Sequence, residues 1–292
     1  SIRRMSHTIW IIAGESSGES YGALLAKELR MVAPDVILRG MGGEAMAREG
    51  VEILVDSSDL GIVGLVEVLK HLPTFYRIFH GLVDRAEAER PDAVVLIDYP
   101  GFNLRFAKRL HQLGIKVVYY VSPQVWAWGR KRIPKIARYV DKMLVIFPFE
   151  TEVYRGTTLD VEFVGHPLLE ILGIAREPKP VRDANLVLLL PGSRRAEVHR
   201  LLPLLLESAR ILGRRRPELR FVLAVPPGGI AAYTREVLEP FQREDGAPDI
   251  AVAEGETREL LTRASAGAAA SGTVTVEAAI LGLPLVVVYK LH

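Results

Sequence analysis

The amino-acid sequence predicts an α/β protein made of two doubly wound, parallel-sheet domains in tandem. Short apolar runs alternate with amphipathic stretches along the whole chain, which is typical of parallel sheets covered by helices. The length of 292 residues exceeds that of one ordinary domain. A segment rich in proline and charge, residues 169–185, interrupts the alternation. We therefore expect an N-terminal domain over 1–168, a linker over 169–185 and a C-terminal domain over 186–292.

The expected strands are apolar runs that are bounded by turn residues, and the expected helices have apolar side chains at helical spacing. In the first domain the strands are 8–13, 36–39, 93–97, 116–121, 143–147 and 161–164. In the second domain they are 186–190, 221–225, 250–253, 267–270 and 285–289. Helices are expected at 21–32, 103–113, 196–212 and 273–281.

Composition narrows the class of protein. The net charge is only +2, so bulk charge does not suggest a nucleic-acid partner. The chain has no cysteine, which excludes disulfides and thiolate chemistry and fits a reducing cytosol. No apolar run approaches the roughly 20 residues of a membrane span. We expect a protein that is soluble or lies on a membrane surface. Because the chain ends at His292, just after a predicted strand, we also expect the second domain to be incomplete.

Asp98 is the most informative residue of the first domain. It ends the apolar run 94–97 and is followed at once by Pro100 and Gly101. Open α/β sheets bind ligands at the carboxyl ends of their strands, so the carboxylate would face a ligand. The alternative is that Asp98 only caps the next helix, and position alone favours neither interpretation.

The turn at residues 13–20 also joins a strand to a helix. Gly14 and Gly18 permit a tight turn and close approach of the backbone to a ligand. Neither a Walker A lysine nor a complete dinucleotide-binding fingerprint is present. A tight turn capped by serine is therefore an equally good explanation, although Glu15 favours function.

Two similar turns in the second domain suit a diphosphate. Gly192, Ser193 and Arg194 follow one buried strand, and a backbone turn beside a guanidinium matches a pyrophosphate. Arg194 could instead lie on a solvated helix start. The sequence has no Asp-x-Asp triplet that could hold a metal ion beside a diphosphate. The negative charge of the diphosphate would instead be neutralised by backbone N–H groups and arginine.

The second of these turns precedes the predicted helix 273–281. Ser271, Gly272 and Thr273 offer hydroxyls and backbone N–H groups at a helix N-terminus. Glu277, one turn inside the helix, could accept hydrogen bonds from ribose hydroxyls. The alternative for Glu277 is simple complementarity to the helix dipole.

Two further segments of the first domain are candidates for binding a lipid. Residues 61–83 have a dense apolar set at helical spacing, which indicates either a core-packed helix pair or a surface for acyl chains. Pro73 would kink this helix or start a new one. The set that we assign to the acyl surface is Val66, Val68, Leu69, Leu72, Phe75 and Tyr76. In residues 119–135, Trp126 and Trp128 precede basic residues that could bind a phosphate or merely solvate a helix start.

Taken together, these segments resemble the lipid-A-disaccharide synthase family, which acts at a membrane surface. The similar motifs run in order over nearly the whole chain: AGESSGE, GIVGLVEVL, IDYPGFN, YYVSPQVWAW, FPFE, FVGHPL, LLPGSRRAEV and ASGTVTVEAA. The sequence departs from the family at Glu19, where aspartate is usual. The family also continues beyond the strand 285–289, which reinforces the expectation of a missing C-terminal part.

The resemblance implies a GT-B architecture, with two Rossmann-like domains that face each other across a cleft. It implies an inverting, metal-independent transfer of 2,3-diacylglucosamine from UDP-diacylglucosamine to diacylglucosamine 1-phosphate. No cofactor is expected beyond the UDP-sugar, which is the donor substrate. The expected location is the cytoplasmic face of the inner membrane, with no nucleic-acid partner and a homodimer as one possible assembly.

The resemblance also assigns roles to residues. Asp98 is the expected general base, with Glu15 as the second candidate. The donor UDP is expected to contact the two turns of the second domain, from Gly192 to Arg194 and from Ser271 to Thr273, together with Glu277. Residues expected to position the acceptor are Ser17, Gly18, Asn103, Gln124 and Trp126.

Two other functions fit the same residues. A UDP-sugar 2-epimerase would share the two domains but would need no apolar acceptor surface. A non-catalytic nucleotide-sugar or lipid-binding module is the other alternative, because the chain looks shortened. A dehydrogenase is disfavoured, since neither half contains G-x-G-x-x-G.

Overall fold

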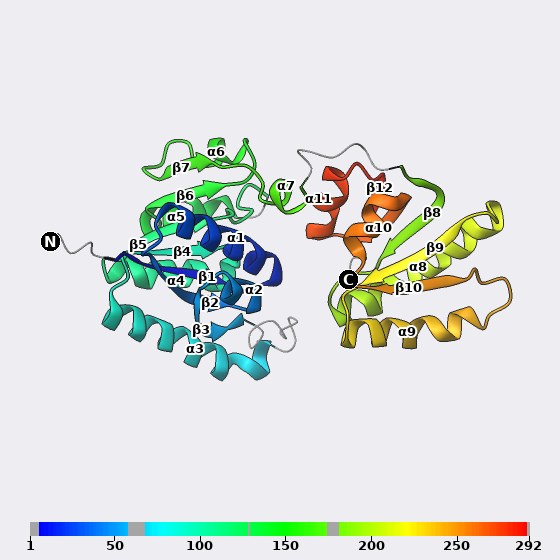
Figure 1. Ribbon diagram of the computed structural model, residues 1–292, viewed down its shortest axis with the longest axis horizontal. Coiled ribbons are helices and arrows are strands. Elements are labelled where there is room, and N and C mark those ends of the chain that lie inside the picture. Colours follow the sequence, from blue (N-terminus) through cyan, green and yellow to red (C-terminus); the bar gives the residue numbers. More distant parts are fainter. Residues whose placement is uncertain (1–5, 58–67, 128, 174–180, 291–292) are drawn as a thin grey trace. The chain divides into compact units, whose positions relative to one another are not determined.

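The computed structural model describes residues 6–57, 68–127, 129–173 and 181–290, and for residues 68–72 only the backbone. The chain divides into two compact units, Ser1–Pro167 and Leu168–His292. Each unit consists of one parallel sheet and the helices that flank it (Figure 1). The predicted α/β class with two parallel-sheet domains is therefore confirmed.

The first sheet has the strand order β3-β2-β1-β4-β5-β6-β7. Its strands are β1 (Thr8–Ala13), β2 (Ile37–Gly42), β3 (Glu52–Asp56), β4 (Ala93–Ile97), β5 (Lys116–Tyr120), β6 (Lys142–Val145) and β7 (Asp160–Phe163). The order reverses between β1 and β4, which is a topological switch point. Ala13 pairs with Ile97, and Ile97 pairs with Tyr120, so the carboxyl ends of β1, β4 and β5 are level.

Helices connect these strands. They are α1 (Ser16–Val32), α2 (Glu44–Arg48), α3 (Val68–Glu89), α4 (Pro100–Gln112), the 3₁₀ helix η2 (Arg130–Arg132), α5 (Ile133–Tyr139) and α6 (Glu150–Val153). The core between α3, α4, α5 and the sheet is rich in aromatic side chains. Trp10, Phe102, Phe106 and Tyr119 are fully buried there.

The second sheet has the order β10-β9-β8-β11-β12 and a switch point between β8 and β11. Its strands are β8 (Asp183–Leu190), β9 (Arg220–Val225), β10 (Ile250–Glu254), β11 (Ala264–Ala270) and β12 (Leu285–Val288). The helices are α7 (Leu168–Ile171), α8 (Arg195–Arg215), α9 (Gly229–Gln242), α10 (Thr257–Arg263) and α11 (Thr273–Ile280). Leu190 pairs with Ala269, so the turns after β8 and β11 are neighbours.

Several element boundaries differ from the prediction. Strand β3 was not predicted, because it is a short edge strand whose first and last residues are acidic and exposed. Helix α1 begins at Ser16 rather than Tyr21, and α4 begins at Pro100, because proline suits the first helical position. Pro73 lies inside α3, whose first residue is Val68. The expected linker 169–185 includes part of α7 and the first residues of β8, and 174–180 lie outside the described residues.

Arg182, which the sequence analysis placed in the linker, holds parts of the second domain together. Its guanidinium donates hydrogen bonds to the carbonyl oxygens of Leu261 at 2.9 Å, Ala264 at 2.7 Å and Leu281 at 2.6 Å. These carbonyls lie at the C-terminal ends of α10 and α11. A cation at two helix C-termini satisfies their open carbonyl groups and complements both dipoles.

We expect Arg182→Ala to lower the free energy of unfolding of the second domain by about 2–3 kcal/mol, because several partly buried carbonyls lose a charged donor. Denaturant unfolding followed by circular dichroism measures this loss. Arg216→Ala is the matched control, since among the described residues Arg216 pairs with exposed Glu218, and such surface pairs contribute little to stability. Equal effects of the two substitutions would contradict the assigned role of Arg182.

Candidate active site

The turn after β4 has an unusual backbone. Asp98 and Tyr99 have φ angles of 46° and 45°, in the left-handed region that non-glycine residues rarely adopt. Helix α4 begins immediately afterwards with Pro100. Two successive residues in this region cost roughly 1–2 kcal/mol each, so the surrounding structure must hold them. This turn, residues 98–99, is called the β4 elbow below.

Two buried side chains hold the β4 elbow. The amide nitrogen of Asn103 donates to the carbonyl oxygen of Asp98 at 2.8 Å and to that of Ile97 at 3.1 Å. The phenol of Tyr119 donates to the same Asp98 carbonyl at 2.6 Å. Both side chains are fully buried. Asn103 therefore contacts the elbow backbone rather than presenting its amide to a ligand, and the role of Tyr119 was missed by the sequence analysis.

Gly14 lets the β1–α1 turn lie against the β4 elbow. A Cβ atom at Gly14 would lie 2.3 Å from the ring of Tyr99, which is far inside van der Waals contact. Tyr99 was not singled out in the sequence, since an aromatic residue before proline gives no functional signal by itself. The contact explains why glycine follows β1, and it brings Glu15 close to Asp98.

The environment of Asp98 favours the protonated carboxyl group. Burial, and then the negative charge of Glu15, raise the pKa of Asp98 from 3.8 to about 6, against a hydrogen bond from backbone at Tyr99. Burial and a nearby negative charge both disfavour the ionised form of a carboxyl group. Such a shift at a switch point is typical of a catalytic acid or base.

A cavity of about 380 Å³ contains Asp98. Its lining includes Gln124, Arg132 and Gly129 from the segment that follows β5. The structure thus brings together Asp98, Gln124 and Arg132, the last being one of the basic residues after Trp128 that the sequence indicated as candidates for binding a phosphate. Trp126 is 41% exposed and meets the ring of Phe149 edge-on, with 5.3 Å between centroids, but does not line this cavity. Trp128 lies outside the described residues.

Ser17 and Gly18 occupy the first turn of α1 rather than a loop. Gly18 is buried, and a Cβ atom there would lie 3.6 Å from the side chains of Ala13 and Ile97. A side chain at this position would therefore point at the sheet, and the role of Gly18 toward a ligand stays a prediction. Glu19 accepts a hydrogen bond from the backbone N–H of Ala45 at 2.8 Å, at the start of α2. This contact gives a structural role to the glutamate that departs from the family pattern.

The turn after β8 already contains an internal anion. The carboxylate of Glu197 accepts hydrogen bonds from the backbone N–H groups of Ser193 at 3.1 Å and Arg194 at 3.3 Å. Its other oxygen pairs with the Arg194 guanidinium at 3.2 Å. A Cβ atom at Gly192 would lie 2.5 Å from this carboxylate. The predicted open cradle for a phosphate is therefore occupied by Glu197, because a glutamate three residues past the N-cap reaches back.

The turn after β11 is open. Ser271, Gly272 and Thr273 are exposed, and no described side chain caps the N-terminus of α11. Burial raises the pKa of Glu277, and the positive charge of Arg258 opposes that rise. Of the two predicted cradles in the second domain, the described residues leave this one available to an anion.

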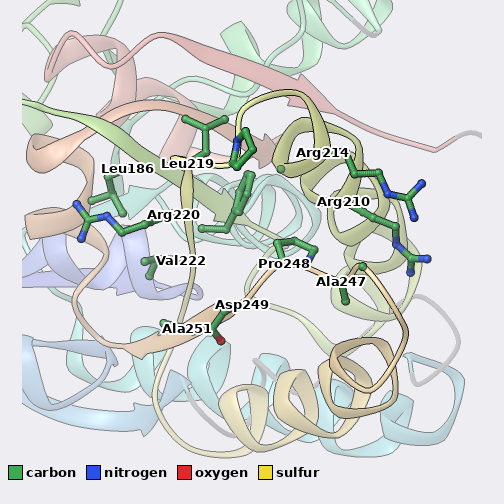
Figure 2. A pocket seen from close by; sticks show the side chains of 14 residues that line it. Leu186, Arg210, Arg214, Leu219, Arg220, Val222, Ala247, Pro248, Asp249 and Ala251 are labelled. Carbon is green, nitrogen blue, oxygen red and sulfur yellow. The ribbon is translucent and has the colours of Figure 1, made fainter.

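A larger cavity of about 550 Å³ lies in the second domain, where β8, β9 and β10 begin (Figure 2). It is far from the strand ends that carry ligand-binding turns. Figure 2 shows the side chains of Arg210 and Arg214 pointing to one side and Arg220 to the other. Arg210 pairs with Glu244, and Arg220 pairs with Asp183. These cations do not converge, so we do not assign this cavity to the site.

The predicted acyl surface is described only in part. Val66 and the side chains of Val68, Leu69 and Leu72 lie outside the described residues. Phe75 packs against the core and meets Phe102 edge-on, with 5.4 Å between ring centroids. Its expected place on an acyl surface is therefore corrected to core packing. Tyr76 is 66% exposed and fits the surface interpretation.

Comparison with known proteins identifies the family. The model of the family described as lipid-A-disaccharide synthetase matches residues 9–292. The lipid-A-disaccharide synthase of Koribacter versatilis (strain Ellin345) is 44% identical over 97% of this chain and 74% of its own length. The chain belongs to the lipid-A-disaccharide synthase family. The relative from Nitrosococcus oceani is 42% identical over 97% of this chain and 73% of its own length. The protein is thus a glycosyltransferase of lipid A biosynthesis, and neither an epimerase nor a non-catalytic module is favoured.

Solved structures support the GT-B-type fold of this synthase. UDP-GlcNAc 2-epimerase from Neisseria meningitidis matches with a TM-score of 0.67 and 13% identity, covering 96% of this chain and 82% of its own. MurG from Acinetobacter baumannii matches with a TM-score of 0.56 and 13% identity, covering 97% and 78%. At such identities the likeness establishes the fold alone.

None of the described helices has the length and apolar character needed to cross a bilayer. The described residues of this synthase form no group of three or more His, Cys, Asp or Glu suited to a metal ion. Metal-independent transfer remains a prediction from the family resemblance.

We expect Gly14→Ala to lower transferase turnover at least tenfold, because the new methyl group displaces Tyr99 and with it the β4 elbow. Radiolabelled sugar transfer measures the loss. Gly101→Ala is the matched control, since a Cβ atom there meets nothing within 4 Å and alanine favours the α4 helix. Normal turnover of Gly14→Ala would refute the coupling between the two turns.

Proposed function

We propose that the protein transfers 2,3-diacylglucosamine from its UDP derivative to the 6-hydroxyl of 2,3-diacylglucosamine 1-phosphate, with Asp98 as general base. The observation that carries this proposal is the half-buried Asp98 carboxylate at the switch point, which shares a cavity with Gln124 and Arg132. Its products are the β-1,6-linked disaccharide 1-phosphate and UDP.

In the proposed step, the Asp98 carboxylate takes the proton of the acceptor hydroxyl while that oxygen attacks the anomeric carbon of the donor. The bond from this carbon to the diphosphate oxygen breaks, and UDP leaves with the electron pair. A single displacement inverts the configuration, so no covalent sugar intermediate is needed. The base needs access to the hydroxyl directly or through one water molecule.

Other first-domain residues would support the base. Glu15 raises the pKa of Asp98 and is the second candidate for a catalytic carboxylate. Asn103 acts as a positioning residue, because its amide holds the Asp98 carbonyl. Gln124 is suited to contact the acceptor sugar from the wall of the cavity. Ser17 and Trp126 remain candidates for positioning the acceptor.

The donor UDP is proposed to bind at the carboxyl ends of β8 and β11. The open N-terminus of α11, from Ser271 to Thr273, offers backbone N–H groups for the diphosphate. Glu277 is placed to accept hydrogen bonds from ribose. Arg194 would supply positive charge after exchanging its pairing with Glu197 for the diphosphate.

The lipid substrates imply action at the cytoplasmic surface of the inner membrane. Exposed Tyr76 on α3 supports contact with acyl chains or headgroups. We propose the same contact for Val66, Val68, Leu69 and Leu72, the other residues of the predicted acyl surface. A homodimer, and function without a metal or nucleic-acid partner, stay predictions of the family resemblance.

We expect Asp98→Asn to lower kcat by about two to four orders of magnitude, because asparagine cannot take the acceptor proton.

The same variant should not destabilise the folded protein. Ionised Asp98 is destabilising in the folded protein, since its pKa is raised from 3.8 to about 6. This cost is absent below about pH 4 and complete above about pH 6, so Asp98→Asn melts at the same or a higher temperature at pH 7.

Single-turnover transfer and thermal melting measure both properties of Asp98→Asn. Asp92→Asn is a control on the same strand, because Asp92 accepts a hydrogen bond from the backbone of Thr8 and lies at the opposite end of β4. Its substitution changes stability rather than turnover. Near-normal turnover of the folded Asp98→Asn variant would exclude base catalysis by this residue.

The pH dependence gives a second test. We expect kcat/KM to fall as the pH falls through about 6, since only ionised Asp98 can accept the proton. Removal of the neighbouring charge in Glu15→Gln should lower the pKa of Asp98 and move this acid limb to lower pH. Initial rates between about pH 4.5 and 9 check both outcomes. An acid limb that Glu15→Gln leaves in place would mean that Glu15 does not act on Asp98.

A further inference from the structure

A groove of about 380 Å³ between α4 and α5 is not used by the proposed mechanism. Its floor is apolar and includes Leu104 and Ile136. Its walls are cationic. The cations are Arg105, Lys108, Arg132 and Lys135. Arg105 and Lys108 are three positions apart on α4, so they lie on one side of that helix. Arg132 is the last residue of η2, and Lys135 lies in the first turn of α5.

The described residues that line this groove include no Asp or Glu. In the described part of the chain, none of the four cations forms an ion pair with a carboxylate. Helix α4 and the segment from Arg130 to Tyr139 contain no Asp or Glu at all. Elsewhere in the first domain, Lys116 and Lys142 pair with Asp141 and Asp160. An uncompensated cationic groove with an apolar floor fits a phosphate attached to a lipid better than a free phosphate.

Arg132 connects this groove to the candidate active site. Its side chain lines both the groove and the cavity that contains Asp98. In glucosamine 1-phosphate, the carbon that carries phosphate and the carbon that carries the CH₂OH arm both flank the ring oxygen. A molecule whose hydroxyl lies at Asp98 therefore has its phosphate only a short bonded path away, and Arg132 lines the same cavity as Asp98.

We propose that the α4–α5 groove binds the phosphate of the lipid acceptor, with Arg132 at its mouth and Lys135 behind it. The inference rests on the proposed function, because it takes Asp98 as the contact of the acceptor hydroxyl. A guanidinium can bind two phosphate oxygens at once, and the lysines add positive charge. The site would make transfer selective for acceptors that carry a phosphate.

The test compares two acceptors in neutral-detergent micelles: 2,3-diacylglucosamine 1-phosphate and the same lipid without its phosphate. We expect the wild-type chain to favour the phosphorylated acceptor by about 10- to 100-fold in kcat/KM. The Arg132→Ala/Lys135→Ala variant should lose most of this preference through a higher acceptor KM. Its KM for the UDP-sugar and its melting temperature should stay unchanged, since both side chains are exposed.

Arg109→Ala is the control for loss of positive charge on α4. Arg109 is exposed, contacts Gln112 and does not line the groove, so this variant should keep the preference. Arg132→Lys should restore part of the preference lost in Arg132→Ala, because it keeps charge without the bidentate geometry. If the double variant discriminates as well as the wild type, the proposal is wrong.

Two further measurements are needed. One distinguishes the acceptor phosphate from a membrane headgroup, and the other distinguishes the groove assignment from the proposed function. Sedimentation with phosphatidylcholine vesicles, with and without phosphatidylglycerol, tests a membrane headgroup as the ligand. If the Arg132→Ala/Lys135→Ala variant no longer binds the vesicles but keeps its preference for the phosphorylated acceptor, the groove binds a membrane headgroup and the acceptor assignment is wrong. Equilibrium binding of each acceptor needs no turnover. If the wild type transfers to neither acceptor but binds the phosphorylated one more tightly through Arg132, the proposed function fails and the groove assignment stands.

Discussion

The backbone of the β4 elbow is the constraint on which the first domain's site depends. Asp98 and Tyr99 both adopt the left-handed region, so the chain turns sharply between a central strand and α4. Asn103 and Tyr119 offset this strain by donating to the Asp98 carbonyl. The same carbonyl is therefore fixed from two sides, and the attached carboxylate is held at the switch point. Rigid support of this kind holds a side chain in place without help from a ligand.

Position in the sheet gives two aspartates on one strand opposite properties. Asp92 precedes β4 and accepts a hydrogen bond from the backbone N–H of Thr8, which lowers its pKa. Asp98 follows β4, where burial and Glu15 raise its pKa. Hydrogen bonds from the backbone favour the charged form of a carboxyl group, whereas burial favours the neutral one. Identical side chains just before and just after one strand thus have pKa values shifted in opposite directions.

The sequence was informative wherever one local pattern determines the outcome. Apolar runs located the central strands, and the register of parallel strands then brings Glu15 close to Asp98 without further information. The edge strand β3 escaped detection because it is short and half-exposed. Long-range contacts escaped for a different reason. Nothing in the spacing of residues indicates that Tyr119 reaches the Asp98 carbonyl, or that Arg182 joins the ends of two helices.

In the second domain, a turn with the residues of an anion-binding motif binds an anion from its own chain. Glycine and arginine after β8 suggest an anion cradle, yet Glu197 from the next turn of helix occupies the same N–H groups. Because a helix N-terminus favours any anion, it binds the glutamate of its own chain when no ligand is present.

A diphosphate that used the N–H groups after β8 would have to displace the Glu197 carboxylate and take over its pairing with Arg194. Part of the energy of that contact would then be spent on breaking internal hydrogen bonds, which weakens net binding. The turn after β11 has no such competitor among the described residues. The two turns are neighbours in the sheet, but the turn after β11 offers an anion free N–H groups whereas the turn after β8 does not. A donor would therefore be anchored mainly by the α11 turn, and the Glu197–Arg194 pair would re-form as UDP leaves.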